Sequence, residues 1–260
     1  MASKMPRIYT RYHGLKFVVF HYMKAKIISW MRKQVRQAGA RGIVMGLSGG
    51  VDSSLAVSLA KEAVGRQRVL ALMLPCHSQK KDLEDARLVA KKLRIQTKAI
   101  DLTPVYDDLI RILPKANSMA AANLKPRLRM AVLYYFANKL NYLVCGTGNK
   151  SELMVGYFTK HGDGATDILP LGDLYKKEVR KLARELGVPG HIIAKPPTAG
   201  LWPEQTDEGE MGLRYAQLDD ILERMEKNKK QIVPSSKVDK VKKMIKRSGH
   251  KRQGPRICYI

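Results

Sequence analysis

Cysteine and long apolar runs are scarce in this 260-residue sequence, and each scarcity excludes a class of protein. The three cysteines, Cys76, Cys145 and Cys258, are widely spaced and include no CxxC pair, so neither a disulfide framework nor a zinc site is indicated. No stretch reaches the roughly 18 apolar residues that a membrane-spanning helix needs. Hydrophobic residues still make up 45% of the chain, which is enough for a folded core. We therefore expect a globular protein of the reducing cytoplasm.

Acidic residues are also few, and the resulting positive charge is concentrated at the two ends of the chain. The sequence holds 48 Lys and Arg against 23 Asp and Glu, a formal net charge of +25. Residues 1–41 contain ten basic residues and no acid, residues 227–260 contain twelve basic residues and one acid, and the body between them is nearly balanced. Such charge favours polyanionic partners: nucleic acid, nucleotides or an anionic membrane surface. The length fits one domain with extensions or two small domains.

The basic N-terminal flank has a helical pattern. An acid-free basic N-terminus is also typical of organelle transit peptides. Here, however, apolar side chains recur at spacings of three and four and a glycine follows the last of them, which favours a packed helix. The predicted apolar stripe consists of Phe20, Met23, Ile27, Met31 and Val35.

From residue 42 onward, short apolar segments alternate with helical patterns, as in βαβ units with a parallel sheet. The predicted strands cover residues 43–47, 69–74, 95–100 and 142–145. The predicted helices cover residues 53–64, 82–93, 123–140, 175–186, 214–225 and 236–246. We expect an α/β fold, with a doubly wound, mainly parallel sheet and helices on both faces.

The sharpest local signal is the run GLSGGVDSS at 46–54, directly between the first predicted strand and its helix. Two adjacent glycines let the backbone turn tightly and point N–H groups inward, and the helix adds the positive end of its dipole. The run therefore predicts a phosphate-binding loop. It is not a Walker loop, because Asp52 and Ser53 stand where that motif has its Lys and hydroxyl residue. The alternative is an ordinary turn in which Asp52 complements the helix dipole.

This loop resembles the pyrophosphate-binding loop of ATP pyrophosphatases, enzymes that cleave ATP between its α and β phosphates to adenylate a substrate. Seven further motifs resemble one branch of that superfamily, the NAD synthetases, in order and spacing. They are NLKPRLRM at 123–130, CGTGNKSE at 145–152, GYFTKHGDGATD at 156–167, LPL at 169–171, KPPTAGL at 195–201, QTDE at 205–208 and HKR at 250–252. The resemblance implies one Rossmann-related domain over 1–260, with a five-stranded sheet and the basic flanks 1–41 and 227–260 as extensions.

The resemblance also implies an ATP site and a metal site. The implied ATP contacts are Gly46, Leu47, Ser48, Gly49, Gly50, Val51, Asp52, Ser53, Thr147, Lys176 and Thr198. Asp52 and Glu152 would hold Mg²⁺, a hard cation that oxygen ligands suit. Lys176 would act as a point charge for phosphate oxygens. Without the resemblance, Glu152 is an ordinary first-turn acid and Lys176 a solvated helix charge.

A second set of residues is implied to bind the other substrate, deamido-NAD. This set consists of Arg127, Lys160, Asp167, His250 and Lys251. The segment 160–167 is rich in glycine, and it would serve as a lid that orders on substrate and excludes water. Asp167 is in addition the candidate for orienting or deprotonating the nitrogen nucleophile.

The implied reaction converts deamido-NAD to NAD. The nicotinate carboxylate attacks the α-phosphorus of ATP, pyrophosphate leaves, and ammonia displaces AMP from the acyl-adenylate. Glutamine-using members carry an additional amidohydrolase domain, for which the 45 residues before the loop leave no room. We therefore expect free ammonia as the nitrogen source, and by resemblance a homodimer with the dinucleotide near the subunit interface.

Two other interpretations remain at this point. The charge of +25 fits an RNA-binding or tRNA-modifying relative of the same fold, although thiolation needs reactive thiols and Cys76 and Cys145 lie in or just after predicted strands, where buried structural thiols are expected. A non-catalytic protein on the same scaffold would have lost its metal carboxylates. Both carboxylates, Asp52 and Glu152, are present.

Overall fold

A four-stranded parallel sheet forms the centre of the described chain. The computed structural model describes the backbone of residues 7–202 and 204–258, and the side chains from residue 21 onward within these ranges. The sheet has the order β3-β2-β1-β4. Its strands are β1 (Gly42–Gly46), β2 (Val69–Met73), β3 (Gln96–Ala99) and β4 (Tyr142–Val144).

The strand order reverses beside β1. Ile43 of β1 pairs with Val69 of β2 on one side and with Leu143 of β4 on the other. The chain first adds β2 and β3 on one side of β1 and then returns to add β4 on the opposite side. In open α/β sheets, ligands bind at the carboxyl ends of the strands at such a reversal. The topology therefore places a site where the loops after β1 and β4 meet.

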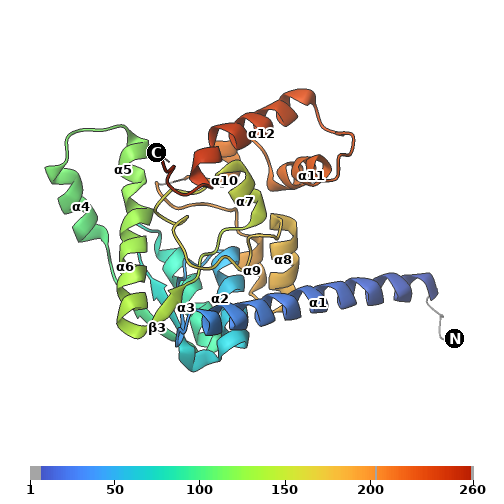
Figure 1. Ribbon diagram of the computed structural model, residues 1–260, viewed down its shortest axis with the longest axis horizontal. Coiled ribbons are helices and arrows are strands. Elements are labelled where there is room, and N and C mark those ends of the chain that lie inside the picture. The colour runs from blue at the N-terminus through green and yellow to red at the C-terminus, as the bar shows by residue number, and fades with distance from the viewer. Residues whose placement is uncertain (1–6, 203, 259–260) are drawn as a thin grey trace.

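Helices cover both faces of the sheet and form a layer at its carboxyl edge (Figure 1). The helices of the described chain are α1 (Arg7–Gln37), α2 (Val51–Val64), α3 (Lys80–Leu93), α4 (Thr103–Ile112), α5 (Ser118–Ala122), α6 (Leu124–Leu140), α7 (Lys150–Val155), α8 (Lys176–Glu185), α9 (Gly190–Ala194), α10 (Asp207–Met211), α11 (Tyr215–Glu226) and α12 (Ser235–Arg247). Two short 3₁₀ turns, at Arg66–Arg68 and Gly249–Lys251, complete them.

Alternating side chains of β1 enter two different cores, because successive strand residues point to opposite faces. Ile43 and Met45 are fully buried in the core that includes side chains of α1, α2, α8 and α9. Val44 is buried in the opposite core, against which side chains of α6 pack. A third core joins α7, α10, α11 and α12, with Tyr215 and Leu218 among its buried members.

The predicted α/β class with a parallel sheet is confirmed, but the described chain has four strands where five were expected. In place of a fifth strand, the described chain has a single parallel bridge between Cys145 and Ile168. Pro170 follows two residues later and has no N–H to donate, so a ladder cannot continue there.

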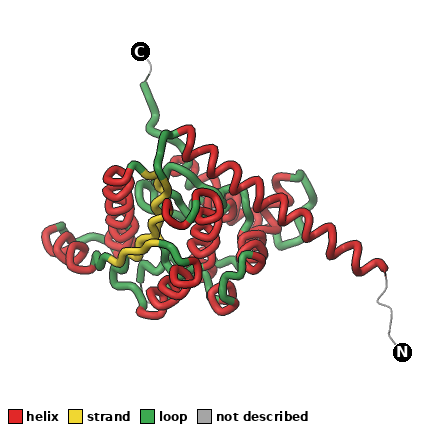
Figure 2. The backbone as a smooth tube through the Cα atoms, turned by 90° about the horizontal axis from the view of Figure 1, so that it is seen from below, coloured by secondary structure: helices red, strands yellow, loops and turns green. Residues whose placement is uncertain are grey.

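The N-terminal flank is helical, as predicted. Met31 and Val35 are buried, and Met23 and Ile27 pack against the same core, whereas the side chain of Phe20 lies outside the described residues. The N-terminal part of α1 extends beyond the rest of the molecule (Figure 2). Among the residues described, no helix has the length and apolarity that a membrane crossing requires.

Candidate active site

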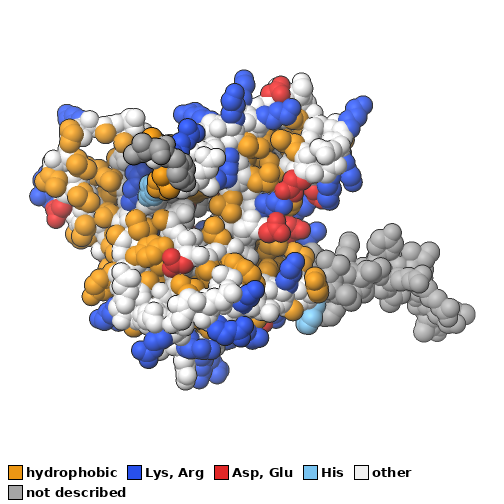
Figure 3. All heavy atoms as spheres, viewed as in Figure 1, with side chains coloured by type: hydrophobic (Ala, Val, Ile, Leu, Met, Phe, Trp, Pro, Cys, Tyr) orange, Lys and Arg blue, Asp and Glu red, His pale blue; other side chains and the backbone are white. Residues whose placement is uncertain are grey.

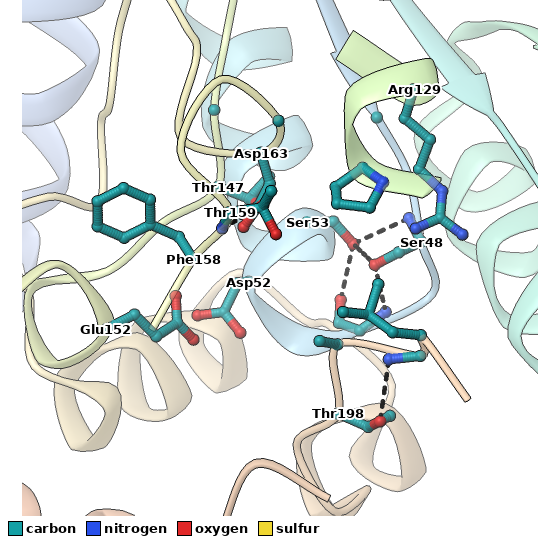
Figure 4. Close-up of a pocket in the computed structure, with 18 of the residues that line it drawn as sticks. Ser48, Asp52, Ser53, Arg129, Thr147, Glu152, Phe158, Thr159, Asp163 and Thr198 are labelled. Carbon is teal, nitrogen blue, oxygen red and sulfur yellow. Dashed lines mark hydrogen bonds between the residues drawn. The ribbon is translucent and has the colours of Figure 1, made fainter. Parts of the chain in front are cut away.

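A cavity of about 520 Å³ lies at the carboxyl edge of the sheet. Its wall combines residues from the loop after β1, the turn after β2, the loop after β4, and the segments 156–166 and 192–210. Figure 4 shows Arg129 at one end of this group and the carboxylates of Asp52 and Glu152 at the other. The predicted phosphate loop and the strand-order reversal thus belong to one site.

At one position of the phosphate loop, Gly49, the backbone conformation and the close packing admit only glycine. Gly49 has a φ of +80°, and a Cβ there would lie 2.3 Å from the carbonyl oxygen of Asp82. The Ser53 hydroxyl donates to the Gly50 carbonyl at 3.1 Å and accepts from the Ser48 N–H at 3.3 Å (Figure 4). No side chain caps the start of α2 in the structure. Its first amides are therefore available to an anion.

The two carboxylates predicted to bind a metal, those of Asp52 and Glu152, both lie beside Lys176, the lysine predicted to bind phosphate. The Lys176 ammonium lies 2.6 Å from Asp52 Oδ2 and 3.2 Å from Glu152 Oε1. Asn149 connects the two loops, because its side-chain amide donates to Asp52 Oδ1 at 2.9 Å while its side-chain oxygen caps α7 through the Glu152 N–H. Asn149 and Lys176 thus both contact Asp52, although they follow it in the chain by 97 and 124 positions.

Burial and neighbouring charges shift the pKa values of Glu152 and Lys176. Burial, together with the neighbouring charge of Asp52, raises the pKa of Glu152 to about 7, although Lys176 opposes the rise. Burial alone would lower the pKa of Lys176, but the charges of Asp52 and Glu152 outweigh it and raise that pKa. The lysine therefore stays a cation in contact with the two carboxylates.

A divalent cation fits this donor set. Within the ranges that the structure describes, no group of three or more His, Cys, Asp or Glu residues could hold a metal ion, so the protein supplies at most two carboxylates at one point. Mg²⁺ is commonly bound by one or two carboxylates together with substrate phosphates and water. Asp52 and Glu152 already converge on one ammonium group beside the phosphate loop, so they are the residues that would hold it.

Two residues of this site carried no assigned role in the sequence analysis. The Tyr215 hydroxyl lies 3.0 Å from Asp207 Oδ2 and 3.2 Å from Glu152 Oε1, and its ring lies 4.8 Å from the Lys176 ammonium. Asp207 lines the cavity and is only 4% exposed. In the sequence, Asp207 is marked only by its place in the QTDE motif at 205–208, and Tyr215 lies outside all the motifs that resemble the family.

The predicted dinucleotide residues divide between the cavity wall and its surroundings. Lys251 lines the cavity, and its ammonium donates to the carbonyls of Gly156 at 2.8 Å and Phe158 at 2.7 Å. Lys160 donates to the carbonyl of His250 at 2.8 Å, and Arg127 donates to the carbonyl of Lys160 at 3.4 Å. Arg127, Lys160 and His250 are therefore close neighbours, outside the lining itself.

Asp167 lies apart from both groups. One of its carboxylate oxygens accepts from the Tyr134 hydroxyl at 3.0 Å, and the other accepts from the Val144 N–H at 2.7 Å. The side chain is exposed and does not line the cavity of this chain. Through the Val144 N–H, the Asp167 carboxylate links the segment 156–167 to the end of β4, next to the cavity.

The remaining ATP candidates lie on the cavity wall, together with an arginine to which no role was assigned. Thr147 and Thr198 both line it, and the Thr198 hydroxyl accepts from the Gly200 N–H at 3.0 Å. Arg129, on α6, donates to the Leu74 carbonyl at 3.0 Å and so holds the turn after β2. Its position within the motif at 123–130 gave no indication of which arginine would face the cavity.

The two strand-associated thiols are buried, as predicted. Burial raises the pKa of Cys145 to about 12 and also raises that of Cys76. Both therefore stay protonated and poorly nucleophilic at neutral pH. This argues against the thiol chemistry that a tRNA-thiolating enzyme would need.

Comparison with known proteins gives consistent matches over nearly the whole chain. A family model described as NAD synthase matches residues 23–255. The chain is 47% identical to the NH(3)-dependent NAD(+) synthetase of Archaeoglobus fulgidus over 247 residues, which are 93% of this chain and 98% of that protein. It superposes on the NMN synthetase of Francisella tularensis with a TM-score of 0.86 at 37% identity, covering 93% of this chain and 99% of that one. The NH3-dependent NAD synthetase of Campylobacter jejuni, in complex with nitrate, gives a TM-score of 0.81 at 30% identity, covering 92% and 99%.

Proposed function

From the premise that this chain belongs to the ammonia-dependent NAD synthetase family, we propose how its cavity carries out that family's reaction. The chain is an NH3-dependent NAD⁺ synthetase, an ATP-using ligase. The observation that carries the assignment of roles is the convergence of Asp52, Glu152 and Lys176 beside the uncapped start of α2.

The ATP phosphates bind along the loop 46–53, where backbone amides and the start of α2 stabilise negative charge. Asp52 and Glu152 would hold Mg²⁺, which would neutralise negative charge on the phosphates when bound. Lys176, whose ammonium contacts both carboxylates beside the loop, would pair with phosphate oxygens as a point charge. Thr147 and Thr198, which both line the cavity, would contact the nucleotide.

Deamido-NAD binds next to this ATP site, through Arg127, Lys160, Asp167, His250 and Lys251. The nicotinate carboxylate oxygen attacks the α-phosphorus, the bond between the α-phosphorus and the bridging oxygen breaks, and pyrophosphate leaves. Ammonia then attacks the acyl carbon, AMP leaves with its bridging oxygen, and the nitrogen loses a proton to give the carboxamide. The protein contributes positioning and charge stabilisation, without a covalent protein intermediate.

Three assays test this assignment. Purified protein should release pyrophosphate and form NAD only when deamido-NAD, ATP, Mg²⁺ and ammonium are all present. Glutamine in place of ammonium should give no steady turnover. Because one structural relative is an NMN synthetase, the acid precursor of NMN should be compared with deamido-NAD, and a higher kcat/KM for the mononucleotide would contradict the dinucleotide assignment.

Asp167 is tested through the two half-reactions. Asp167→Asn should slow amidation, measured by quenching the acyl-adenylate with ammonium, more than adenylation, measured by pyrophosphate release. Equal slowing of both steps would mean that Asp167 only anchors Tyr134 and Val144.

We further propose that the enzyme is a cytoplasmic homodimer. The three free thiols fit a reducing compartment. Large apolar side chains are exposed on and just after α4, among them Val105, Ile112 and Leu113, and such a patch is typical of a subunit interface. Sedimentation as a monomer at micromolar concentration would contradict the dimer.

A further inference from the structure

A buried hydrogen-bond network behind the cavity wall connects α7, α8 and α11. Ser151 precedes Glu152 on α7, and its hydroxyl accepts from the Lys176 N–H at the start of α8 at 3.0 Å. The same hydroxyl donates to Asp219 Oδ1 on α11 at 2.5 Å. The other oxygen of Asp219 accepts from the Lys177 N–H at 2.9 Å. One carboxylate of α11 therefore holds both α7 and α8, directly beside the two residues that reach the site.

The members of this network are buried, but they are not part of the cavity wall. Ser151 is 0% and Asp219 1% exposed, and the lining that the described residues form includes Glu152 and Lys176 without them. A buried carboxylate is costly unless its oxygens are hydrogen-bonded, and here each oxygen has a donor. The two amide donors belong to the first turn of α8, whose N–H groups have no partner within their own helix. The network can therefore act on the reaction only through the backbone that it holds.

A second residue on the same face of α11 contacts the two groups directly. Tyr215 precedes Asp219 by four residues, about one helical turn, so the two side chains lie on one face of the helix. The Tyr215 hydroxyl lies 3.2 Å from Glu152 Oε1, and its ring centre lies 4.8 Å from the Lys176 ammonium. Leu218 anchors this part of α11, because it is fully buried in the core that α11 shares with α7, α10 and α12. A packed face of α11 therefore supports both groups.

We propose that Asp219 is a positioning residue for the reaction. Through its two hydrogen bonds, it keeps Glu152 in contact with the Lys176 ammonium, beside Asp52. These groups must act at one point, since the carboxylates would hold the metal and the lysine would pair with phosphate. Residues that orient metal ligands from behind typically contribute about 10- to 100-fold in metal affinity or activity. The proposal rests on the roles assigned above to the three groups, and it gives Asp219 no contact with a substrate.

Asp219→Asn tests this role, because the amide has nearly the same shape but cannot accept at both positions. The variant should lower kcat about ten-fold. It should weaken the binding of Mn²⁺ together with α,β-methylene ATP by a similar factor, measured by electron paramagnetic resonance of the free ion. KM for deamido-NAD should stay within about two-fold, because the residues proposed to bind it lie outside the network. All measurements are made well below the unfolding midpoint of the variant, so that loss of folded protein does not enter.

Ser151→Ala tests the same linkage from its other end, and it replaces Asp219→Asn if that variant does not fold. Removal of this one hydroxyl should give the same pattern of lower kcat, weaker Mn²⁺ binding and little change in KM for deamido-NAD. The double variant should lose no more than the worse of the two single variants, because both residues act in one chain of hydrogen bonds. Additive losses would show independent effects and would contradict the linkage.

The matched control is Asp220→Asn, which removes the neighbouring carboxylate of α11, one that pairs with Arg224 at the surface. It should leave kcat and Mn²⁺ binding unchanged. If Asp219→Asn lowers only the unfolding temperature and leaves both quantities unchanged, or if it raises KM for deamido-NAD as much as it lowers kcat, the proposal is overturned. No NAD formation by the unaltered enzyme would instead overturn the assigned function.

Discussion

At the scale of the residue, Lys176 compensates the charge of two half-buried carboxylates. Its ammonium contacts Asp52 and Glu152, and the side chain is 2% exposed. Isolated charges at such burial would be strongly unfavourable. The lysine thus balances the charge of the two acids, and its ammonium lies beside the phosphate loop through its contact with Asp52.

Replacing Lys176 should make folding depend on the metal. Lys176→Met leaves the half-buried carboxylates of Asp52 and Glu152 uncompensated, so we expect a loss of about 3 kcal/mol in the free energy of unfolding. Mg²⁺ with ATP should restore more of this loss than it adds to the unaltered protein. Urea unfolding with and without Mg²⁺ and ATP measures both effects.

The adjacent Lys177 is the control for that variant. It is more exposed and pairs with Glu223 on the surface, so Lys177→Met should cost less than about 1 kcal/mol. Comparable losses in the two variants would contradict the role of Lys176.

At the scale of the element, the phosphate loop packs directly against the first turn of α3. A Cβ on Gly49 would meet the Asp82 carbonyl oxygen at 2.3 Å, at a φ of +80°. Gly49→Ala should therefore destabilise the protein by about 2 kcal/mol or more and abolish turnover. A Cβ on Gly46 meets no atom within 4 Å, so Gly46→Ala should be nearly neutral in thermal unfolding. Equal stability of both variants would show that the loop adapts.

The same turn of α3 also holds the segment that carries Thr198. Lys195 pairs with Asp82 at 2.5 Å and with Asp85 at 2.8 Å, and His191 contacts Asp85 at 2.9 Å. Burial alone would raise the pKa of Asp85, but the hydrogen bonds from Lys195 and His191 outweigh it and lower that pKa.

This arrangement predicts a loss of stability in acid. Because the pKa of Asp85 is lower in the folded state than its ordinary value of 3.8, the stabilisation is complete above that value and is lost as the pH falls through the folded pKa. Lys195→Met should lower the free energy of unfolding at neutral pH by about 1–3 kcal/mol. It should also flatten the dependence of stability on pH between about 5 and 2, measured by urea titration. An unchanged slope would contradict the ion pair.

At the scale of the whole molecule, the basic flanks are part of the packed structure. In the C-terminal flank, Val238 and Val241 of α12 are buried against α11, while Lys and Arg side chains lie over the outside of this region (Figure 3). We propose that the flanks extend one domain, and that their excess charge steers the two polyanionic substrates to the cavity.

Steering predicts a dependence on salt. The association rate of ATP or deamido-NAD, measured by stopped flow, should fall as ionic strength rises from about 0.01 to 0.15 M, because the Debye length shortens from about 30 to 8 Å. The dissociation rate should change less. An association rate that is insensitive to salt would count against steering.

The sequence by itself determined the alternation of strands and helices, the phosphate loop and the family. These features depend on short windows of the chain, in which periodicity, adjacent glycines and motif spacing are directly visible. The expected fifth strand rested on the resemblance and on no local pattern, and the described chain has in its place a single parallel bridge between Cys145 and Ile168.

The tertiary structure alone decided which side chains meet. Asn149 reaches Asp52 across 97 positions and Lys176 reaches it across 124, because β1 and β4 are neighbours in a sheet whose order reverses between them. The same packing buries Asp207 against Tyr215 and leaves one of its oxygens without a partner. No local pattern encodes these contacts, since burial and electrostatic pairing arise only when distant elements pack together.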